Sequence, residues 1–590
     1  VLVACARSGA DAVHPGYGFL AENATFAQAV LDAGLTWVGP TPESIRLMGD
    51  KLSAKRIAEK SGVPTLPSRE LAKGDNVSAA AKDIGYPVLI KASAGGGGKG
   101  MRVVHAEGEL QAAVDAARRE SKAAFGDDTI FLERWLTSSR HVEIQILGDN
   151  HGNLVHCFER ECSIQRRHQK IIEEAPSPAV TPEMRKRMGA AAVSAAKAIG
   201  YRSAGTVEFL LEGKDFWFLE VNTRLQVEHP VTEEITGLDL VREQLRIAQG
   251  EPLGYTQDDL RIDGHAIEAR VYAEDPSNDF LPAPGRVAVW EPSRAAGARF
   301  DSGVESGSEV GIEFDPMLAK VIVHAPTRTE AAMRLARVLE TTRIQGITTN
   351  RDFLVNTLRH PAFLAGDTTT DFIKRIVPAT RRTIDRDELV EAAIAVSMMA
   401  QGRRRDDAKV MKSVPSGWRN SVMPPETVCY RHGNDDVTVN YRIQRGGGFV
   451  FEIGGISYNV TVGRRTHESI ELVINGRRNT TSTASAGDLW LVHGFRGDVE
   501  LRELPRFPVA GAEVESGGLT APMPGNVFSI RVAVGDRVEK GQHLLIVEAM
   551  KMEHQITAPY DGTVVAIHVS EGDQVANGEL LVVLANDDVD

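Results

Sequence analysis

Two apolar segments of the chain each carry one carboxylate, Glu208 in residues 205–210 and Glu220 in residues 216–222. A buried carboxylate needs a partner, and a divalent cation beside nucleotide phosphates is the simplest partner for two of them. For either carboxylate alone, a structural ion pair is the alternative. Residues 223–230 (TRLQVEHP) follow directly and gather arginine, glutamine, glutamate and histidine in a loop, where catalytic groups often lie. This arrangement predicts metal-assisted chemistry beside a charged loop.

A run of glycines, residues 95–100 (GGGGKG), lies between segments 86–91 and 101–104, which we expect to be strands. Consecutive glycines destabilise a fold, because each loses the most backbone entropy on folding. They do allow backbone N–H groups to approach phosphate oxygens closely. The run lacks the Gly-Lys-Ser/Thr ending of a Walker loop, and a flexible linker is the alternative. We interpret it as a phosphate-binding loop.

A lysine between two methionines, Lys551, lies between two copies of one pattern, residues 530–545 and 567–581. Each copy alternates apolar and polar residues, breaks at Gly-Asp and breaks again at a second glycine. The repetition predicts short strands in a two-fold-like β-sandwich, with Lys551 at the tip of a hairpin. An exposed lysine is normally a solvated charge. Methionines on both sides of it are better explained by recognition of this turn.

The composition is that of an ordinary globular protein of 590 residues, with 42% hydrophobic and 25% charged residues. A chain of this length is expected to form about four domains. Its net charge of −13 argues against nucleic acid or an anionic membrane as the main partner. No apolar run approaches the ~18 residues that a transmembrane helix needs. The 4 cysteines show no metal-ligand spacing, which is typical of a reducing compartment.

The elements that must position these groups are predicted from the hydrophobic pattern. Residues 1–65 have the pattern of an α/β segment in which Asn23 or Thr25 caps a helix. Segments between 437 and 492 alternate and predict an antiparallel meander or barrel. Residues 385–405 before them predict a helix with one apolar side, formed by Leu389, Ala392, Ala393, Val396 and Met399. This region contains no catalytic constellation, so we interpret it as a docking domain.

The sequence Ala549-Met550-Lys551-Met552 within such a repeat resembles the biotin carboxyl carrier domain. The resemblance implies that Lys551 carries biotin on an amide and that the methionines help a biotin protein ligase to select it. Lipoyl domains are similar in fold but usually lack this Met-Lys-Met sequence, so we favour biotin over lipoate, and both over an unmodified lysine. Residues 506–517 are expected to tether the carrier so that it can visit separate sites.

The glycine run, the carboxylate pair and the charged loop, in this order, resemble the biotin carboxylase branch of the ATP-grasp enzymes over residues 1 to about 375. The resemblance implies that ATP, Mg²⁺ or Mn²⁺, and bicarbonate bind here, with Glu133 and His141 on the adenosine side. Residues implied to contact nucleotide or bicarbonate are Lys51, Lys91, Gly95, Gly96, Gly97, Gly98, Gly100, Glu133, His141, Gln165, His168, Lys170, Leu210, Gln226 and Val227. Residues implied to hold the metal are Glu208, Glu220 and Asn222.

The same resemblance implies that the catalytic residues are Glu228, Arg270, Arg224 and Lys170. Bicarbonate is a weak nucleophile and must lose its proton to attack the γ-phosphorus of ATP, and Glu228 resembles the general base for that step. Arg224, Gln226 and the Val227 backbone resemble the bicarbonate cradle, where a guanidinium is preferred for its bidentate geometry. Phosphoryl transfer then needs mainly positioning and charge neutralisation. Arg270 matches the arginine that stabilises the biotin enolate, although the sequence alone predicts a surface ion pair there.

Residues 376–505 resemble the subunit-mediating domain in α subunits of propionyl-CoA and 3-methylcrotonyl-CoA carboxylases. The chain as a whole therefore resembles an acyl-CoA carboxylase α subunit, which carboxylates its own biotin. No segment resembles a carboxyltransferase, so a β subunit is expected to act on the acyl-CoA, whether propionyl-, acetyl- or 3-methylcrotonyl-CoA. The resemblance also implies a dimer through the biotin carboxylase region. The expected location is the cytoplasm in a bacterium or the mitochondrial matrix in a eukaryote.

Two other functions stay open at this stage. One is an ATP-grasp ligase that joins a carboxylate to an amine, with a lipoyl-like accessory tail. The other is a biotin-bearing scaffold without activity, which the intact set of Glu208, Glu220 and Glu228 argues against. The family begins with a strand–helix segment carrying an Asn-Arg-Gly-Glu-type motif that is not found here. About two βα units, of roughly 30 residues each, are therefore expected to precede Val1.

The expected fold class is α/β followed by β: an ATP-grasp biotin carboxylase, a helix-plus-antiparallel-β docking domain and a small β-sandwich biotinyl domain. The expected boundaries are 1–65 for the remainder of an N-terminal α/β domain, 66–260 for the ATP-grasp domain with its lid at about 66–135, 261–375 for the biotin carboxylase C-terminal domain, 376–505 for the docking domain, 506–517 for the linker and 518–587 for the biotinyl domain.

Overall fold

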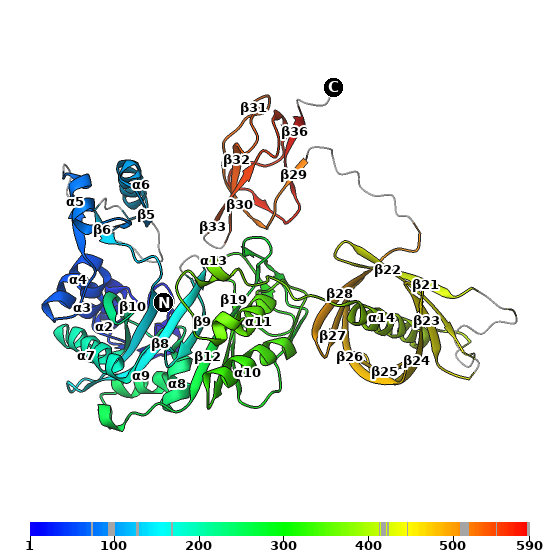
Figure 1. The fold of residues 1–590 in the computed structure, drawn as a ribbon, viewed down its shortest axis with the longest axis horizontal. Coiled ribbons are helices and arrows are strands. Elements are labelled where there is room, and N and C mark those ends of the chain that lie inside the picture. The colour runs from blue at the N-terminus through cyan, green and yellow to red at the C-terminus, as the bar shows by residue number, and fades with distance from the viewer. Residues whose placement is uncertain are drawn as a thin grey trace.

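A computed structural model describes residues 1–71, 75–92, 101–125, 129–166, 169–411, 414, 421, 424–444, 446–507, 518–549 and 552–586. Figure 1 shows a blue-to-green body of helices and sheets, a yellow barrel around one helix, and an orange-red sandwich near the C-terminus. The predicted glycine run, His168 and Lys551 lie outside the described residues.

An antiparallel sheet with the strand order β11-β10-β7-β8-β9-β12-β19-β17 runs through the blue-to-green body. Its strands are β7 (Arg140–Gly148), β8 (Leu154–Arg166), β9 (Gln169–Ala175), β10 (Ser203–Glu212), β11 (Asp215–Asn222), β12 (His265–Tyr272), β17 (Ala298–Ser302) and β19 (Met317–Ala325). Helices that pack against it are α7 (Pro182–Ala198), α8 (His229–Thr236), α9 (Leu240–Ala248), α10 (Arg328–Thr341) and α11 (Arg351–Arg359). The sheet therefore has both faces covered.

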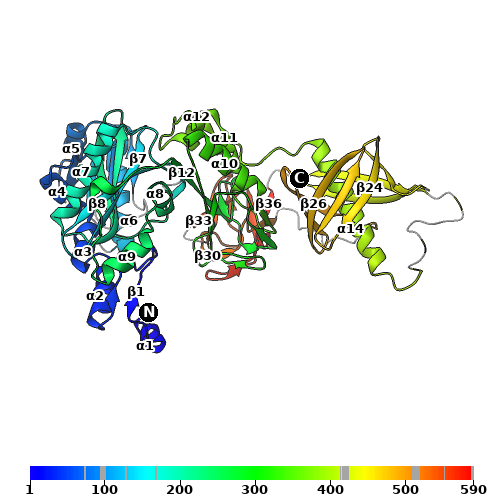
Figure 2. The same ribbon diagram turned by 90° about the horizontal axis from the view of Figure 1, so that it is seen from below.

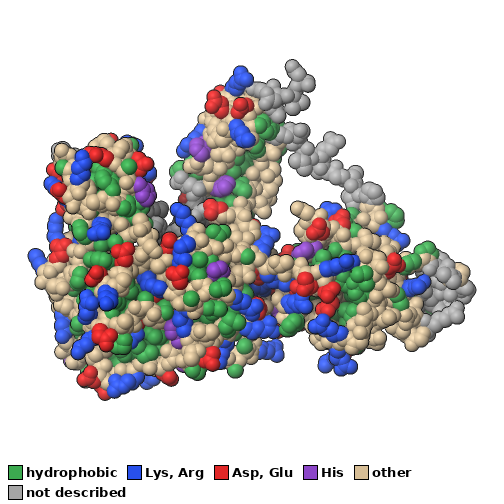
Figure 3. Space-filling model, viewed as in Figure 1, with side chains coloured by type: hydrophobic (Ala, Val, Ile, Leu, Met, Phe, Trp, Pro, Cys, Tyr) green, Lys and Arg blue, Asp and Glu red, His purple; other side chains and the backbone are tan. Residues whose placement is uncertain are grey.

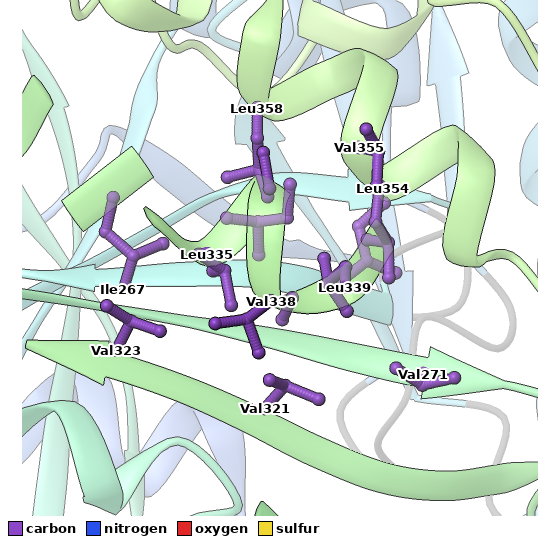
Figure 4. Close-up of a cluster of buried hydrophobic side chains, with 14 of the residues drawn as sticks. Ile267, Val271, Val321, Val323, Leu335, Val338, Leu339, Leu354, Val355 and Leu358 are labelled. Carbon is purple, nitrogen blue, oxygen red and sulfur yellow. The ribbon is translucent and has the colours of Figure 1, made fainter. Parts of the chain in front are cut away.

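Strand β12 separates the hydrophobic core from the charged interior of the sheet. Ile267, Ala269 and Val271 on one face join α10 and α11 in a buried cluster (Figure 4). Each fully buried Ile or Val side chain there contributes about 1.5–3 kcal/mol to folding. Successive side chains of a strand point to opposite faces, so Glu268 and Arg270 point to the other face. That face is buried as well, which is why these charges need partners.

A smaller sheet, with the order β3-β6-β4-β5, packs against two helices. Its elements are β3 (Ser68–Leu71), α5 (Val77–Ile84), β4 (Val88–Ala92), β5 (Arg102–Val104), α6 (Glu107–Phe125) and β6 (Ile130–Arg134). β4 and β5 pair antiparallel, which confirms the two strands predicted on either side of the glycine run.

The N-terminal residues form an α/β segment, as predicted. Its elements are α1 (Leu2–Ser8), β1 (Ala12–Val13), α2 (Ala24–Asp32), β2 (Thr36–Trp37), α3 (Pro42–Gly49) and α4 (Lys51–Lys60), and β1 pairs parallel with β2. Asn23 caps α2, because its side chain accepts a hydrogen bond from the Phe26 backbone N–H. Thr25, the alternative cap, lies inside the helix instead.

A closed barrel surrounds one helix, α14 (Arg386–Asp406), which lies inside the yellow strands in Figure 1. The prediction of one apolar side on this helix is wrong. Residues between the predicted ones, such as Ile394 and Ala395, are fully buried too, since the barrel contacts the helix from several directions. The strands are β21 (Glu426–His432), β22 (Asp435–Ile443), β23 (Phe449–Ile453), β24 (Ile456–Arg465), β25 (Ser469–Ile474), β26 (Arg477–Ala486), β27 (Leu489–Gly494) and β28 (Gly497–Glu503).

The C-terminal residues form the predicted sandwich, from sheets with the orders β29-β36-β34-β31 and β33-β32-β30-β35. Its strands are β29 (Gly518–Thr520), β30 (Gly525–Ile530), β31 (Arg537–Val538), β32 (His543–Ala549), β33 (Met552–Thr557), β34 (Gly562–Ile567), β35 (Gln574–Val575) and β36 (Leu580–Asn586). β32 and β33 pair up to Ala549 and Met552, which confirms the hairpin whose tip holds the predicted lysine.

Short elements connect these parts. They are η1 (Gln257–Asp259), β13 (Glu274–Asp275), β14 (Leu281–Pro282), β15 (Gly285–Arg286), β16 (Val289–Glu291), β18 (Glu309–Val310), β20 (Arg343–Gln345), α12 (Pro361–Leu364) and α13 (Phe372–Ile376). Over the described residues, the helices include none that is both long and apolar enough to cross a membrane. Basic and acidic side chains are interspersed on the face seen in Figure 3.

Candidate active site

The two carboxylates predicted to bind a metal ion, Glu208 and Glu220, lie opposite each other on neighbouring strands, and we refer to them as the metal pair. β10 and β11 run antiparallel, and Glu208 and Glu220 are direct register partners. Glu208 is buried, whereas Glu220 is half-buried. Burial and the charge of Glu208 raise the pKa of Glu220, because two carboxylates repel each other where water is scarce. A cation between them would relieve that repulsion.

The side-chain oxygen atoms around Glu208 fit a divalent cation that prefers oxygen ligands. Asn222 donates from Nδ2 to Glu208 Oε1 at 2.9 Å. His141 Nε2 lies 2.9 Å from Glu208 Oε2, and ligand atoms of His141, Glu143 and Glu208 lie within 4.8 Å of one another. The structure thus brings the predicted Glu208 and Asn222 together and adds Glu143 to the same cluster.

Lys170, at the start of β9, connects these carboxylates to the charged loop. Its Nζ lies 2.6 Å from Glu143 Oε2, 3.0 Å from Glu208 Oε1 and 2.5 Å from Glu228 Oε1. Burial disfavours the ammonium form, but these three carboxylates raise the pKa of Lys170 well above its usual value. One permanent cation therefore joins the metal pair to Glu228.

Glu228 lies at the N-cap of α8 and is 2% exposed. Its Oε2 accepts a hydrogen bond from Arg270 Nη2 at 2.9 Å, and Arg270 also pairs with Glu173 on β9. Burial disfavours the carboxylate, but Lys170 and Arg270 hold the pKa of Glu228 well below its usual range, so it is ionised. The prediction of a surface ion pair for Arg270 is wrong, because this arginine is 7% exposed and lies within a buried charge array.

The loop residues before Glu228 are fixed by hydrogen bonds. Arg224 donates from Nε to Glu22 Oε2 at 2.9 Å and from Nη2 to Asn222 Oδ1 at 3.0 Å. Gln226 donates from Nε2 to Glu208 Oε1 at 2.9 Å. Arg224 and Gln226 are thus connected to Glu208 and Asn222 by hydrogen bonds.

Three further predicted contacts surround this cluster. Gln165, near the end of β8, is the register partner of Lys170 on β9. Leu210 lies on β10 and is half-buried. The Val227 carbonyl accepts a hydrogen bond from Lys320 Nζ at 2.8 Å, so the backbone of the charged loop is held by β19.

Positive charge gathers where the small sheet meets α4. Lys91 on β4 pairs with Glu133 on β6, and Lys55 Nζ also donates to Glu133 Oε1 at 2.9 Å. Burial lowers the pKa of Lys51, whose charge interacts with those of Glu220, Lys91 and Glu133. The charges of Lys51 and Lys91 also act on Glu220, so these two lysines lie beside the carboxylate pair.

Glu133 and His141, predicted on the adenosine side together, occupy different places. Glu133 belongs to the small sheet and binds lysines, whereas His141 belongs to the large sheet and contacts Glu208. Burial disfavours the imidazolium, but Glu208 raises the pKa of His141 overall. The chain therefore has a carboxylate–histidine contact beside its metal pair that the sequence pattern does not indicate.

Several buried charged residues were not found from the sequence. Arg160, Glu143, Glu173 and Glu268 stand inside strands, where a charged residue in an alternating pattern normally faces water. Burial raises the pKa of Glu173 to about 7 and that of Glu268 well above its ordinary value. Glu173 and Glu268 are register partners on β9 and β12. The only available signal was the number of charges in strands that are otherwise strongly apolar.

The family comparisons cover most of the chain. Residues 1–45 match the biotin carboxylase N-terminal domain, 50–256 the carbamoyl-phosphate synthase L chain ATP-binding domain, and 268–375 the biotin carboxylase C-terminal domain. Residues 385–506 match the BT domain of the methylcrotonyl-CoA carboxylase alpha subunit, and 518–584 the family of biotin-requiring enzymes.

Solved structures resemble the body of the molecule. The biotin carboxylase domain dimer of Hydrogenobacter thermophilus 2-oxoglutarate carboxylase, with MgADP and bicarbonate, has a TM-score of 0.63 and 43% identity, over 65% of this chain and 85% of that chain. Biotin carboxylase of Campylobacter jejuni has a TM-score of 0.62 and 40% identity, over 63% and 84%. The fold is that of an ATP-grasp biotin carboxylase.

Relatives extend this similarity to nearly the whole chain. The mitochondrial methylcrotonoyl-CoA carboxylase subunit alpha of Dictyostelium discoideum is 42% identical, over 93% of this chain and 82% of the relative. The propionyl-CoA carboxylase alpha chain of Ruegeria pomeroyi is 40% identical, over 94% and 86%. The chain belongs to the family of alpha subunits of biotin-dependent acyl-CoA carboxylases.

Proposed function

We propose that the chain uses MgATP and bicarbonate to carboxylate biotin on its own Lys551, and that a partner carboxyltransferase then transfers the carboxyl group to an acyl-CoA. The observation that carries this proposal is the position of Glu228, 2.5 Å from Lys170 Nζ and 2.9 Å from Arg270 Nη2, beside the Glu208 cluster. An ionised carboxylate here can accept a proton within reach of a metal and of two fixed cations.

Glu228 takes the proton of bicarbonate, which then attacks the γ-phosphorus of ATP. A carboxylate with a lowered pKa holds a proton weakly, so the pKa of the bound bicarbonate must also fall. Lys170 and the Arg224 guanidinium supply the positive charge for this, and Gln226 completes the anion cradle. Glu208, Glu220 and Asn222 are the residues that would hold Mg²⁺, which neutralises phosphate charge when bound.

The attack of bicarbonate expels ADP and forms carboxyphosphate, which breaks down to CO₂ and phosphate. Biotin, when bound, would supply the ureido nitrogen, which loses its proton to this phosphate and takes up the CO₂. Arg270 provides a guanidinium for the negative charge that develops on the ureido oxygen. Its contacts with Glu228 and Glu173 fix the guanidinium before biotin arrives, so little reorganisation is needed. Lys51 and Lys91 hold the phosphates of ATP, together with the glycine run, which lies outside the described residues.

The test is Glu228→Gln, which keeps the shape of the side chain and removes the base. Bicarbonate-dependent ATP hydrolysis is expected to fall by about 10²–10⁴-fold, while titration calorimetry shows nucleotide binding retained. Glu234→Gln is the matched control, because Glu234 lies on the same helix α8, half-buried, and contacts Arg299 at 3.4 Å outside the site. Normal turnover by Glu228→Gln would refute the assignment of the base.

The partners follow from the family and from the parts of the chain. The barrel of residues 376–505 is proposed to bind the carboxyltransferase β subunit, the biotin carboxylase region to form a dimer, and the sandwich of residues 518–587 to be the substrate of a biotin protein ligase. Relatives act, by their names, on methylcrotonoyl-CoA or propionyl-CoA, and the acyl-CoA used here is proposed to be of this class. Eukaryotic relatives are named as mitochondrial, which supports the mitochondrial matrix as the location in a eukaryote. For a bacterium, the cytoplasm is proposed.

A further inference from the structure

One buried methionine of the C-terminal sandwich, Met523, is grouped among the described residues with apolar side chains of another part of the chain. Met523 is 1% exposed, and the buried side chain grouped with it is Leu281, with the half-buried Ile312 packed against both. The core of the sandwich is a different cluster, which includes Val527 and Leu545. Met523 therefore contacts the biotin carboxylase region, and this contact contributes to its burial. Figures 1 and 2 both show the orange-red sandwich against the green part of the chain.

The surface that receives Met523 is built from two turns of the biotin carboxylase C-terminal region. Leu281 belongs to β14, which pairs antiparallel with β13. Ile312 follows β18 in the chain. The β13–β14 hairpin is closed by backbone hydrogen bonds from the N–H groups of Asn278 and Leu281. Leu281 is thus presented on a structured turn, and we refer to Leu281 and Ile312 as the seat.

The hairpin that carries the seat is fixed to the strand that ends at the active site. Glu274 on β13 pairs with Arg166, the last residue of β8. The Arg166 guanidinium also lies 4.7 Å from the centroid of the Phe280 ring, next to Leu281 in the chain. The preceding strand residue, Gln165, is the register partner of Lys170. A sandwich that rests on this seat is therefore held against the elements that form the carboxylation site.

We propose that Leu281 and Ile312 form a docking seat for the carrier sandwich of the same chain, with Met523 as its buried anchor. The inference rests on the proposed function, because it names the surface on which the carrier presents biotin for carboxylation. A single methionine in a shallow apolar seat makes a small interface, and small interfaces belong to transient contacts. The covalent connection supplies a high effective concentration, so a weak contact suffices and the carrier can leave for the partner enzyme. Methionine suits a contact that forms and breaks repeatedly, because its side chain adapts to irregular apolar surfaces.

The experiment uses the full-length chain, with biotin on the carrier verified by intact mass. Carboxylation of the carrier is measured as incorporation of labelled bicarbonate in a single turnover with MgATP, and ATP hydrolysis with free biotin is measured in parallel. Met523→Ala is expected to slow carrier carboxylation by about tenfold or more, since full burial of a methionine side chain is worth at least that factor. Free biotin needs no docking, so its rate stays unchanged, and Met523→Leu keeps most of the carrier rate.

Phe528→Ala is the matched control, because Phe528 is a large apolar residue of the same sandwich that is 55% exposed. It is expected to leave both rates unchanged. Leu281→Ala should reproduce the Met523→Ala defect, and the double variant should be no slower than either single one, because both remove one contact. Wild-type carrier carboxylation by Met523→Ala would overturn the proposal, as would an equal loss of activity toward free biotin. If the wild-type chain itself failed to hydrolyse ATP with bicarbonate and free biotin, the proposed function would be at fault instead.

Discussion

At the scale of single residues, Arg160 is the centre of the buried polar network beneath the candidate site. Its guanidinium donates to Glu143 and Gln145 at 2.6 Å, to Thr232 at 3.0 Å, and to Thr206 and Gln226 at 3.1 Å. Each of the five N–H donors of an arginine thus has an acceptor. Because Gln226 accepts through its Oε1, its amide N–H group is turned toward Glu208.

Arg160→Lys keeps the charge but has three donors instead of five, so the orientation of Gln226 and Glu143 is lost. We expect kcat/KM for bicarbonate to fall by about 10- to 100-fold, as is typical for a residue that orients a ligand-binding group. The KM for ATP is expected to change little, and steady-state kinetics separates the two. Arg185→Lys is the control, since Arg185 forms its two bonds to Glu159, at 2.6 and 2.7 Å, outside the site. Equal effects of the two substitutions would contradict the role of Arg160.

His156 makes the stability of the large sheet depend on pH. It packs so closely against α7 that a Cβ added at Gly189 would lie 2.3 Å from its ring. Burial, together with the charge of Arg185, lowers the pKa of His156 from 6.5 to about 4. As the pH falls, the His156 imidazole takes up a proton in the unfolded chain before it does so in the folded chain. The contribution of the neutral His156 to the free energy of unfolding is therefore complete above pH 6.5 and is lost as the pH falls toward 4.

We expect His156→Phe to remove this contribution while it keeps a ring in the same space. The free energy of unfolding, measured with urea at several pH values, should then fall less steeply between pH 6.5 and 4 in the variant than in the wild type. Carboxylates destabilise both proteins equally in acid, so the difference between the curves isolates the histidine. Parallel curves would show that His156 titrates normally.

The sequence indicates some of these residues and hides others for a physical reason. Glu208 could be predicted because it interrupts an apolar segment, and Glu228 because it lies in the adjacent loop rich in functional groups, which resembles the family's motif. Arg160 and Glu173 could not, because each stands next to other charged residues, in 159–161 and 173–174, and charged residues are mostly exposed to water. Only the folded structure, in which β7, β8 and β9 are neighbouring strands, shows that the side chains of Arg160 and Glu173 are buried.

At the scale of elements, α14 shows the same limit. Its helical character and its start were predicted, and Asp385 caps it by accepting a hydrogen bond from the Glu388 N–H at 2.8 Å. Its environment was not predicted, because small residues such as Ala395 complete the apolar surface around the helix without standing out in the sequence. A helix buried on most sides by a closed barrel cannot show a clear amphipathic period.

Met399→Ala tests how far the barrel depends on this helix. Met399 is fully buried within the barrel cluster, so we expect a loss of about 2–5 kcal/mol in the stability of the barrel. Met333→Ala is the matched control on α10, where the methionine is 44% exposed and a change within about 0.5 kcal/mol is expected. Scanning calorimetry measures both. Bicarbonate-dependent ATP hydrolysis should persist in Met399→Ala, since the candidate active site lies in another part of the chain. If the barrel of Met399→Ala unfolded at the same temperature as in the wild type, the stability of the barrel would not depend on this methionine.

At the scale of the whole molecule, one carboxylate of the barrel connects it to the biotin carboxylase region. Asp498 on β28 accepts hydrogen bonds from Gln345 Nε2 and His493 Nδ1, each at 2.8 Å, and pairs with Arg351 on α11. Arg382 Nη2 donates to the Asp498 backbone carbonyl at 2.5 Å. Burial disfavours the charge, but Arg351 and His493 lower the pKa of Asp498, so it is ionised at neutral pH. The two parts of the chain are therefore joined by a buried charge contact.

Asp498→Asn removes the charge and leaves the buried Arg351 with Asp352, 2.9 Å away, as its remaining carboxylate partner among the described residues. The loss of one partner of a buried ion pair costs about 3–5 kcal/mol. We expect the barrel to unfold at a lower temperature than the biotin carboxylase region, and scattering in solution to report a wider range of interdomain distances. Asp488→Asn is the control, because Asp488 pairs with Arg502 at the surface, with side chains 54% and 53% exposed, where solvent screens the pair and little change in stability is expected. If Asp498→Asn behaved like this control, the connection would have to rest on the surrounding apolar and backbone contacts instead of the charge.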